Sequence, residues 1–347
     1  MAAAKLFFIT PALSGGGIEQ SIPILIEQLR QTANYDLAWF GVNRSEFHRE
    51  IVGVSIDSMK RESGSGLLAT IYAIRNLRSL IALEERPIVI ANGEAAELLA
   101  LTLPSRIPII CVEHASRPWI MNKGLGYLVR KLISFKDVHW VTVNRNQGSI
   151  WPQITKFETI YNPIDQIPFS DNDHDVGLIH IGRVTADKGI EKVCLAAENV
   201  GMKLDVYGDG DLLSQLRLKY SQNSDVIFHG FTHDVWKMIG RKRLLISASL
   251  HEGDGRNVAE AIMRRQPLLL LDTFDHRRFA LPDIHYFRDL DSLIAKIQDH
   301  RSDDFNRLRP SEALAEHEML KRSPAGIAKI WSSLINSIAV RRYGHDI

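Results

Sequence analysis

Hydrophobic residues along the chain fall into short, nearly unbroken runs, separated by longer segments in which apolar positions recur every three or four residues. The runs have the length of buried parallel strands, and the longer segments have the period of amphipathic helices. In the first half, strands are expected at residues 5–10, 36–42, 87–92, 107–113 and 138–144. A second series is expected at residues 176–182, 202–208, 225–230, 243–249 and 267–272.

This alternation predicts an α/β protein, because strands separated by helices form βαβ units around parallel sheets. A chain of 347 residues also exceeds what one hydrophobic core usually supports. We therefore expect two Rossmann-like, doubly wound lobes that face each other across a cleft at their ligand-binding strand ends. The best linker is segment 161–176, which carries two prolines and a polar run. The expected lobes are residues 1–168 and 169–324.

Charge and cysteine content narrow the class of protein. The formal net charge is +1, whereas a general nucleic-acid-binding domain is usually strongly basic. Cys111 and Cys194 sit in apolar stretches far apart in the sequence, as core thiols of a reducing compartment do. The first apolar run is interrupted by Pro11 and then by glycines. It is therefore too short for a signal peptide or a membrane span. A cytoplasmic location is expected.

Two loops carry candidate ligand-binding residues. Gly15, Gly16 and Gly17 follow the first strand and precede a helix, where glycine allows close backbone approach to a ligand and helix N–H groups can face an anion. A tight turn is the alternative. Arg183 and Lys188 lie five residues apart on the loop that opens the second lobe. They can converge on one anion, or both can be solvated surface charges.

The stretch HEGDGRNVAEA, residues 251–261, places Glu252 and Glu260 on either side of two glycines. Asn257 followed by Glu260 has the spacing of a capping box, which satisfies backbone N–H groups at a helix start. That structural interpretation accounts for Glu260 and leaves Glu252 without a role.

In this order, the segments GGGIEQ, GRVTADKG, YGDGDLLSQL, VIFHGF and EGDGRNVAEAI resemble the retaining glycosyltransferases of family four, which have the GT-B fold. The resemblance is strongest over residues 177–272. It implies a metal-independent enzyme without a further cofactor. Such an enzyme moves a hexosyl or N-acetylhexosaminyl group from a nucleoside-diphosphate sugar, with UDP favoured, to a hydroxyl acceptor with retention. It also implies an acceptor-side first lobe, onto which a C-terminal helix near residues 325–347 packs back.

The resemblance also assigns roles to residues. Arg183 and Lys188 would hold the donor diphosphate, Glu252 the donor-sugar hydroxyls and Glu260 the ribose. His114, which ends a strand of the first lobe, would lie against the donor sugar, or it is a structural histidine. The expected catalytic residues are Glu252, His114, Arg183 and Lys188. The expected donor-binding residues are Gly16, Gly17, Gly182, Arg183, Lys188, Gly208, Gly230, Phe231, Glu252, Gly253, Asp254, Gly255, Arg256, Asn257, Val258 and Glu260. Asp254 and Gly255 stand where family members commonly have an aromatic residue and a proline.

Three alternatives stay open. A metal-dependent GT-A transferase could use Asp209 and Asp211 as metal ligands. An NAD-dependent oxidoreductase would need a GxGxxG fingerprint, which the first strand–helix turn lacks. A non-catalytic nucleotide-sugar-binding protein would share the donor site and differ only in turnover.

The remaining partners follow from the function class. The acceptor would be a glycan or lipid-linked sugar in polysaccharide or glycolipid synthesis, and no nucleic acid is expected. Residues 119–136 mix apolar and basic side chains. They form either a helix packed on its sheet or a peripheral contact with the inner face of a membrane.

Overall fold

The computed structural model describes residues 4–13, 16–32, 35–43, 51–61, 67–116, 119, 122–145, 147, 156–165, 167 and 176–344. Three of the sequence predictions therefore lie partly outside the described residues, at Gly15, at Ile120 and Met121, and in most of the linker. Two compact units make up the chain: Met1–Asp165 with Lys321–Ile347, and Gln166–Leu320. No helix in the described ranges is long and apolar enough to cross a membrane.

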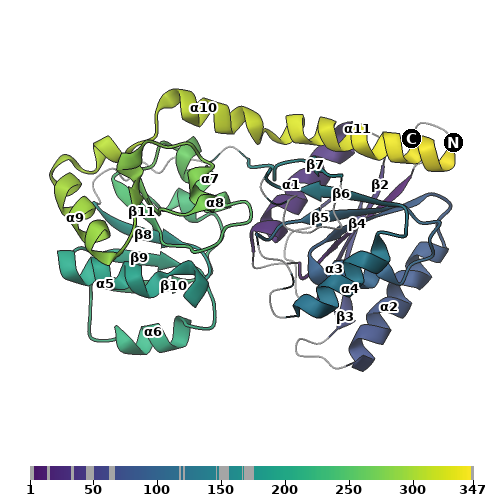
Figure 1. Cartoon of the computed structure of the whole chain (residues 1–347), viewed down its shortest axis with the longest axis horizontal. Helices are drawn as coiled ribbons and strands as arrows, with labels where there is room; N and C mark the ends of the chain where they lie inside the picture. Colours follow the sequence, from purple (N-terminus) through teal and green to yellow (C-terminus); the bar gives the residue numbers. More distant parts are fainter. Residues whose placement is uncertain are drawn as a thin grey trace. The chain divides into compact units, whose positions relative to one another are not determined.

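The first unit is built on one parallel sheet with the strand order β3-β2-β1-β4-β5-β6-β7 (Figure 1). Its strands are β1 (Lys5–Thr10), β2 (Asp36–Asn43), β3 (Val54–Arg61), β4 (Pro87–Asn92), β5 (Ile109–Glu113), β6 (Val138–Thr142) and β7 (Glu158–Thr159). Its helices are α1 (Gly17–Thr32), α2 (Leu67–Ala82), α3 (Glu94–Leu101), α4 (Lys123–Ile133) and α11 (Pro324–Tyr343). Helix α11 is the last element of the described chain and packs against α1.

Two hydrophobic clusters cover the two faces of this sheet. One contains side chains of α1 and α11, including Leu25 and Trp331. The other contains side chains of α2, α3 and α4, including Leu77, Leu99 and Ile133. Strand residues alternate between the two clusters because successive side chains of a strand point to opposite faces. The near-continuous apolar runs of the sequence are the consequence.

The second unit has the strand order β10-β9-β8-β11-β12-β13, also parallel (Figure 1). Its strands are β8 (Gly177–Ile181), β9 (Leu204–Tyr207), β10 (Val226–Gly230), β11 (Arg243–Ser247), β12 (Leu268–Leu271) and β13 (Tyr286–Phe287). Its α-helices are α5 (Ile190–Val200), α6 (Leu213–Lys219), α7 (Arg256–Met263), α8 (Phe274–Arg277), α9 (Leu290–His300) and α10 (Glu312–Lys321). Its 3₁₀-helices are η1 (Ala186–Lys188), η2 (Val235–Lys237), η3 (Asp283–His285), η4 (Arg301–Asp303) and η5 (Asn306–Leu308).

Both sheets reverse their strand order, between β1 and β4 in the first unit and between β8 and β11 in the second. The crevice outside the carboxyl ends of the strands at such a reversal is where open α/β sheets bind ligands. The loops that follow β8 and β11 are therefore the first place to look for a site in the second unit.

The α/β fold class predicted from the sequence is confirmed, and every predicted strand is present. Strands β3, β7 and β13 were not predicted. β7 and β13 contain two residues each, too few for a recognisable run. β3 is an edge strand with the mixed sequence VSIDSMKR, which lacks the continuous apolar pattern of a buried central strand.

Candidate functional site

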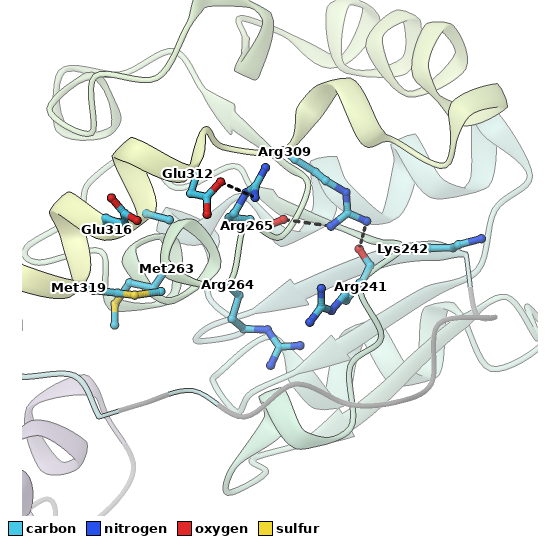
Figure 2. Close-up of a pocket in the computed structure, with 10 residues that line it drawn as sticks. Arg241, Lys242, Met263, Arg264, Arg265, Arg309, Glu312, Glu316 and Met319 are labelled. Carbon is cyan, nitrogen blue, oxygen red and sulfur yellow. Dashed lines mark hydrogen bonds and ion pairs between the residues drawn. The ribbon is translucent and has the colours of Figure 1, made fainter.

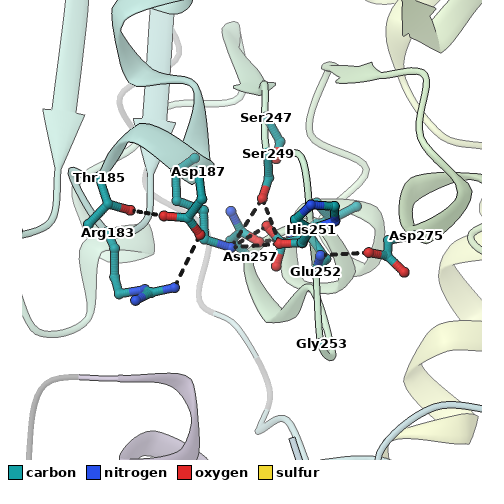
Figure 3. A network of polar contacts seen from close by, with 12 residues as sticks. Arg183, Thr185, Asp187, Ser247, Ser249, His251, Glu252, Gly253, Asn257 and Asp275 are labelled. Atoms are coloured by element: carbon teal, nitrogen blue, oxygen red, sulfur yellow. Dashed lines mark hydrogen bonds and ion pairs between the residues drawn. The ribbon is translucent and has the colours of Figure 1, made fainter. Parts of the chain in front are cut away.

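Lys188 and Glu252 meet at the switch point of the second sheet. Lys188 ends the 3₁₀-helix η1 after β8, and Glu252 lies on the loop after β11. The Nζ of Lys188 lies 2.7 Å from the Oε1 of Glu252. It also donates to the Oγ of Ser249 at 3.2 Å and to the carbonyl of His251 at 3.4 Å. Figure 3 shows Ser249, His251 and Glu252 converging on this point. The two residues that the sequence placed in separate motifs are direct neighbours.

Glu252 carries its charge in a buried setting, since only 7% of the residue is exposed. Burial by itself raises the pKa of a carboxyl group, but the positive charge of Lys188 and its hydrogen bond outweigh burial and hold the pKa of Glu252 below its ordinary value. An ionised carboxylate that is held in place is a strong acceptor for hydroxyl groups. The pair is thus a preformed polar centre at the carboxyl end of the sheet.

His276 is a further side chain near this centre, and it was not singled out in the sequence. It is fully buried, and burial lowers its pKa, so the imidazole is neutral near pH 7. Its Nδ1 lies 2.8 Å from the carbonyl of Leu271 and therefore carries the proton. Its Nε2, 3.2 Å from the Oγ of Ser247, then accepts a hydrogen bond from that hydroxyl group. Sequence spacing gives no signal for this contact, because Ser247 ends β11 and His276 lies in α8, 29 residues further along the chain.

The loop around Glu252 is held by two further side chains that sequence reasoning missed. The Oδ2 of Asp275 accepts a hydrogen bond from the backbone N–H of Glu252 at 2.9 Å (Figure 3). The Nη1 of Arg278 donates to the carbonyl of Gly253 at 2.5 Å and lies 3.4 Å from the carbonyl of Glu252. These contacts fix the backbone of the loop and, with it, the direction of the Glu252 side chain.

Arg183 is not drawn into the Lys188–Glu252 pair. Its side chain is 63% exposed, and its Nη2 lies 3.4 Å from the Oδ2 of Asp187 (Figure 3). The hydroxyl of Thr185 donates to the other oxygen of Asp187 at 2.5 Å. Arg183 and Lys188 nevertheless lie on the same segment at the carboxyl end of β8. The long side chain of Arg183 is exposed there and can move toward a ligand.

Glu260 lies inside α7, where its carboxylate has two close partners. Its Oε1 is 2.7 Å from the Nε of Arg256, and its Oε2 accepts a hydrogen bond from the indole N–H of Trp236 at 2.8 Å. The capping-box interpretation was wrong. Helix α7 begins at Arg256 after Gly255, no side chain caps it, and Asn257 instead donates its amide to the carbonyl of Ile181 at 2.6 Å. Trp236 was not predicted, since it lies 24 residues before Glu260.

The predicted glycines mark places where backbones come close. A Cβ on Gly208 would lie 1.8 Å from the carbonyl oxygen of Gly182, so the loops after β8 and β9 can touch only with glycine at 208. Gly255 has φ 58°, a conformation that glycine adopts without strain, and it directs the chain into α7. Gly230 ends β10 and is followed by the partly exposed Phe231. All lie at the carboxyl edge of the second sheet.

The rest of segment 253–258 lies in the same loop and the first turn of α7. Asp254 is buried, with 8% exposed, and Val258 is fully buried. An acidic side chain in this loop is thus sequestered rather than solvated, although the family pattern has a different residue there. Asp209, the metal ligand of the GT-A alternative, accepts a hydrogen bond on Oδ1 from the N–H of Gly210 at 2.7 Å.

The first-unit candidates lie at the carboxyl ends of β1 and β5. Gly16 precedes α1, which begins at Gly17. His114 follows β5, and its Nε2 lies 3.0 Å from the Oδ1 of Asn92 at the end of β4. Asn92 is in turn tied by its amide to the carbonyl of Ile9 at 3.2 Å. His114 is therefore oriented by a side chain from the neighbouring strand.

Comparison with known proteins bears on the Lys188–Glu252 centre directly, because both residues lie in the matched region. Residues 166–280 match the family model of glycosyl transferases group 1. No curated protein matches the sequence significantly.

Solved structures match over nearly the full length of both chains. HepE from Anabaena, in complex with UDP and glucose, is 14% identical, with a TM-score of 0.80 over 96% of this chain and 100% of its own. Sucrose-phosphate synthase from Thermosynechococcus elongatus is 12% identical, with a TM-score of 0.82 over 97% of this chain and 100% of its own. At these identities the likeness establishes the fold, which is GT-B.

Proposed function

We propose that the protein is a retaining glycosyltransferase that moves a hexosyl or N-acetylhexosaminyl group from a UDP-sugar to a hydroxyl acceptor. The observation that carries this proposal is the Lys188–Glu252 pair at the switch point of a sheet that matches the group 1 transferases. The pair offers a cation for a phosphate and a charged acceptor for sugar hydroxyls within one loop cluster. The acceptor would be a glycan or lipid-linked sugar in polysaccharide or glycolipid synthesis.

Lys188 and Arg183 would stabilise the leaving diphosphate. Negative charge grows on the diphosphate as the glycosidic bond breaks, and a cation already aimed at it lowers the barrier. Lys188 is anchored by Ser249, His251 and Glu252 and so costs little to position. Arg183 would swing from Asp187 onto the phosphate. In this proposal the two side chains perform the task that a metal ion performs in other transferases.

Glu252 and Glu260 would address opposite ends of the donor. Glu252 accepts hydrogen bonds from the sugar hydroxyls, while Glu260, held by Arg256 and Trp236, binds the ribose hydroxyls. Gly208, Gly230 and Phe231 would line the nucleotide. Structures of HepE contain UDP and UDP-glucose, which favours uridine as the base.

His114 would act from the first unit, the proposed acceptor side. Its Nε2 is engaged with Asn92, which sets the orientation of the ring. In this proposal the imidazole would lie against the donor sugar.

A thermal-shift panel with UDP, GDP, ADP and CMP tests the donor assignment. A nucleotide at 100 times its dissociation constant stabilises the folded state by roughly 2.7 kcal/mol. UDP should give the largest rise in melting temperature, and a larger rise with another nucleotide would overturn the uridine assignment. UDP-sugar that binds but is never consumed would instead mark a non-catalytic binding protein.

We also propose a peripheral membrane contact through α4. The helix buries Gly126, Val129, Arg130 and Ile133 and exposes a stripe of large apolar side chains on its other side. Leu125, Leu128, Leu132 and the following Phe135 are 41%, 51%, 43% and 77% exposed. No acidic residue occurs in α4, and Lys123 and Lys131 are exposed beside the stripe. An apolar face flanked by cations suits the interface of an anionic bilayer.

Co-sedimentation with vesicles of phosphatidylcholine, with and without phosphatidylglycerol, tests this contact. We expect binding to the anionic vesicles and its loss in Leu128→Glu. The matched control is Leu218→Glu, on α6 of the second unit, where the leucine is 77% exposed. Equal binding of the Leu128→Glu and parental proteins, or no binding by the parental protein, would contradict the proposal.

The proposed membrane contact would lie on the cytoplasmic side, where the free thiols of Cys111 and Cys194 stay reduced.

A further inference from the structure

Arginine side chains join separate segments in both units, at opposite edges of the two sheets. In the Gln166–Leu320 unit they line a cavity of about 550 Å³ (Figure 2). There Arg309 donates to the carbonyl of Arg265 at 3.1 Å and to that of Arg241 at 2.8 Å. Residues 241 and 265 precede β11 and β12, so this cavity lies at the amino-terminal edge of its sheet. The first unit has a buried arginine at its carboxyl-terminal edge, next to the strand end that carries His114.

This arginine is Arg130, which lies in α4 and is fully buried. Its Nε and Nη2 donate to the two carboxylate oxygens of Glu97 in α3, at 3.0 Å and 2.7 Å. The same Nη2 donates to the Oε2 of Glu113, the last residue of β5, at 2.6 Å. Both carboxylates are buried as well. Arg130 therefore joins two helices to the end of a central strand.

Aromatic side chains fix the surroundings of Arg130. The indole N–H of Trp119 donates to the Oε2 of Glu97 at 2.9 Å. A Cβ on Gly126 would lie 2.3 Å from a ring carbon of Trp119, so α4 can approach the indole this closely only with glycine at that position. The guanidinium of Arg130 also lies 5.2 Å from the centre of the Trp140 ring. Such close packing leaves the guanidinium little freedom to move.

Glu113 connects Arg130 to the backbone around His114. While its Oε2 accepts from Arg130, its Oε1 accepts a hydrogen bond from the backbone N–H of Ala115 at 3.0 Å. This second bond spans His114. The direction of the Glu113 side chain therefore sets the turn of backbone from which the imidazole projects.

The ring of His114 is held in turn by Asn92. The side-chain amide of Asn92 donates to the carbonyls of Ile9 and Ile90, each at 3.2 Å, so its Oδ1 is the atom that accepts from His114. The Nε2 of His114, 3.0 Å from that oxygen, then carries the proton. Hydrogen bonds weaken steeply when their distance or angle changes. The tautomer of His114 therefore reports the position of the ring.

The charge of Arg130 acts on Glu113 as well. Burial raises the pKa of Glu113 to about 7, Arg130 lowers it, and Glu97 raises it further. Without the guanidinium, the carboxyl group would be protonated throughout the neutral range, and a protonated carboxyl group is a weaker acceptor for the N–H of Ala115. The position and the charge of Glu113 thus both depend on Arg130.

We propose that Arg130 is a positioning residue for the proposed sugar transfer. It acts through Glu113 and the N–H of Ala115 to hold the imidazole of His114 against the donor sugar. This inference rests on the proposed function, which places His114 at that sugar. A displacement of about 1 Å in an active site can lower turnover by about 100-fold, so a small shift of the ring is measurable.

The first test is the tautomer of His114 in the full chain, read from NMR spectra of nitrogen-15-labelled histidine at about pH 8, above the ordinary imidazole pKa of about 6.5. The signals of His114 are those that disappear in His114→Gln. The parent should show the proton on Nε2, and Arg130→Met should show a mixture of tautomers. Arg130→Lys should lie between them, because lysine keeps the charge but not the paired donors.

The matched control is Ile133→Ala. Ile133 is a fully buried residue of the same helix, so its truncation weakens the packing of α4 without removing a partner of Glu113. It should show the parental tautomer. Glu113→Gln, with the same readouts, covers a failure of Arg130→Met to fold, because it removes one ion pair and leaves Arg130 paired with Glu97.

The second test is release of UDP from UDP-glucose, UDP-galactose and UDP-N-acetylglucosamine. The kcat of Arg130→Met should fall by about 10- to 100-fold. The KM should change much less, because the contacts assigned to the diphosphate and the ribose lie in the other unit. Ile133→Ala should keep the parental kcat, which a general loss of stability in α4 would not spare.

The outcomes separate this inference from the proposed function. An unchanged His114 tautomer in Arg130→Met and Glu113→Gln would overturn the positioning role, and so would an equal change in Ile133→Ala. A mixed tautomer with parental kcat would overturn its link to the reaction. A parent that releases no UDP from any of the three sugars would contradict the proposed function, while a mixed tautomer in Arg130→Met would still establish that Arg130 positions His114.

Discussion

Glu252 has an expected effect on stability that can be measured apart from its proposed role in donor binding. Its pKa is lowered in the folded protein, so its pairing with Lys188 stabilises the fold above the ordinary carboxyl pKa of 4.5, and this contribution is lost as pH falls through the lowered value. Glu252→Gln should reduce the free energy of unfolding at pH 7 by about 2 kcal/mol, because it leaves a buried cation less well paired.

Urea denaturation of the parent and Glu252→Gln at pH 7 and near pH 3 measures this difference. We expect the gap between the two proteins to narrow at the lower pH, because the stabilisation by the ionised carboxylate is lost as the pH falls toward its lowered pKa. Glu191→Gln, an exposed carboxylate of α5, is the control and should show little change at either pH. A gap of the same size at both pH values would show that the ion pair does not account for the loss.

In the proposed donor site, Arg278 would be a positioning residue, and its contribution should show in ligand affinity. Its Nη1 donates to the carbonyl of Gly253, so Arg278→Ala should loosen the loop that carries Glu252 and weaken UDP binding by about 10-fold, the cost of one charge-assisted hydrogen bond. Arg278→Lys should recover part of the affinity. Arg277→Ala, which removes exposed contacts to Asp272 and Asp283, is the matched control in the same titration. An Arg278→Ala protein with parental UDP affinity would remove Arg278 from the site.

The loops after β8 and β9 pack closely against each other, and this contact predicts the effect of replacing Gly208. Gly208→Ala would place a methyl group 1.8 Å from the carbonyl oxygen of Gly182, so the backbone must shift, at a cost of about 3 kcal/mol or less if the loops relax. Gly201→Ala is the control: its φ is 59°, and a Cβ there meets nothing within 4 Å. It should cost only about 1 kcal/mol for the left-handed backbone. Chemical denaturation compares them, and equal losses would contradict the close approach.

The strands and helices also show which parts of the fold the sequence could predict. Buried central strands were found because both of their faces are apolar, and β3 was missed because an edge strand with a mixed pattern looks like a loop. The helix α7 was predicted near its true start, but the capping residues were wrong. Asn257 bonds the carbonyl of Ile181 in β8, a tertiary contact that local spacing cannot reveal.

At the scale of the whole molecule, parallel strands of the second sheet bring distant motifs to one edge. The resemblance to glycosyltransferases placed Lys188 and Glu252 in one donor site, and the structure brings their side chains within 2.7 Å of each other. His276, Arg278 and Trp236 were not predicted. His276 lies in α8, Arg278 directly follows α8, and Trp236 lies in η2. Their identity alone gives no sign that they contact the site. Motifs thus single out the proposed site residues, whereas no motif marks the residues that hold them in place.

The central claim, sugar transfer that relies on protein cations, is tested most directly by release of UDP from a panel of UDP-sugars in excess EDTA. The parent should keep its turnover under chelation. Lys188→Ala and Arg183→Ala should each lower it by at least about 100-fold, if a few kcal/mol of transition-state stabilisation is lost. Lys192→Ala, a cation of the neighbouring helix α5, should not. Activity that EDTA abolishes and manganese restores, or full turnover in Lys188→Ala, would contradict the account.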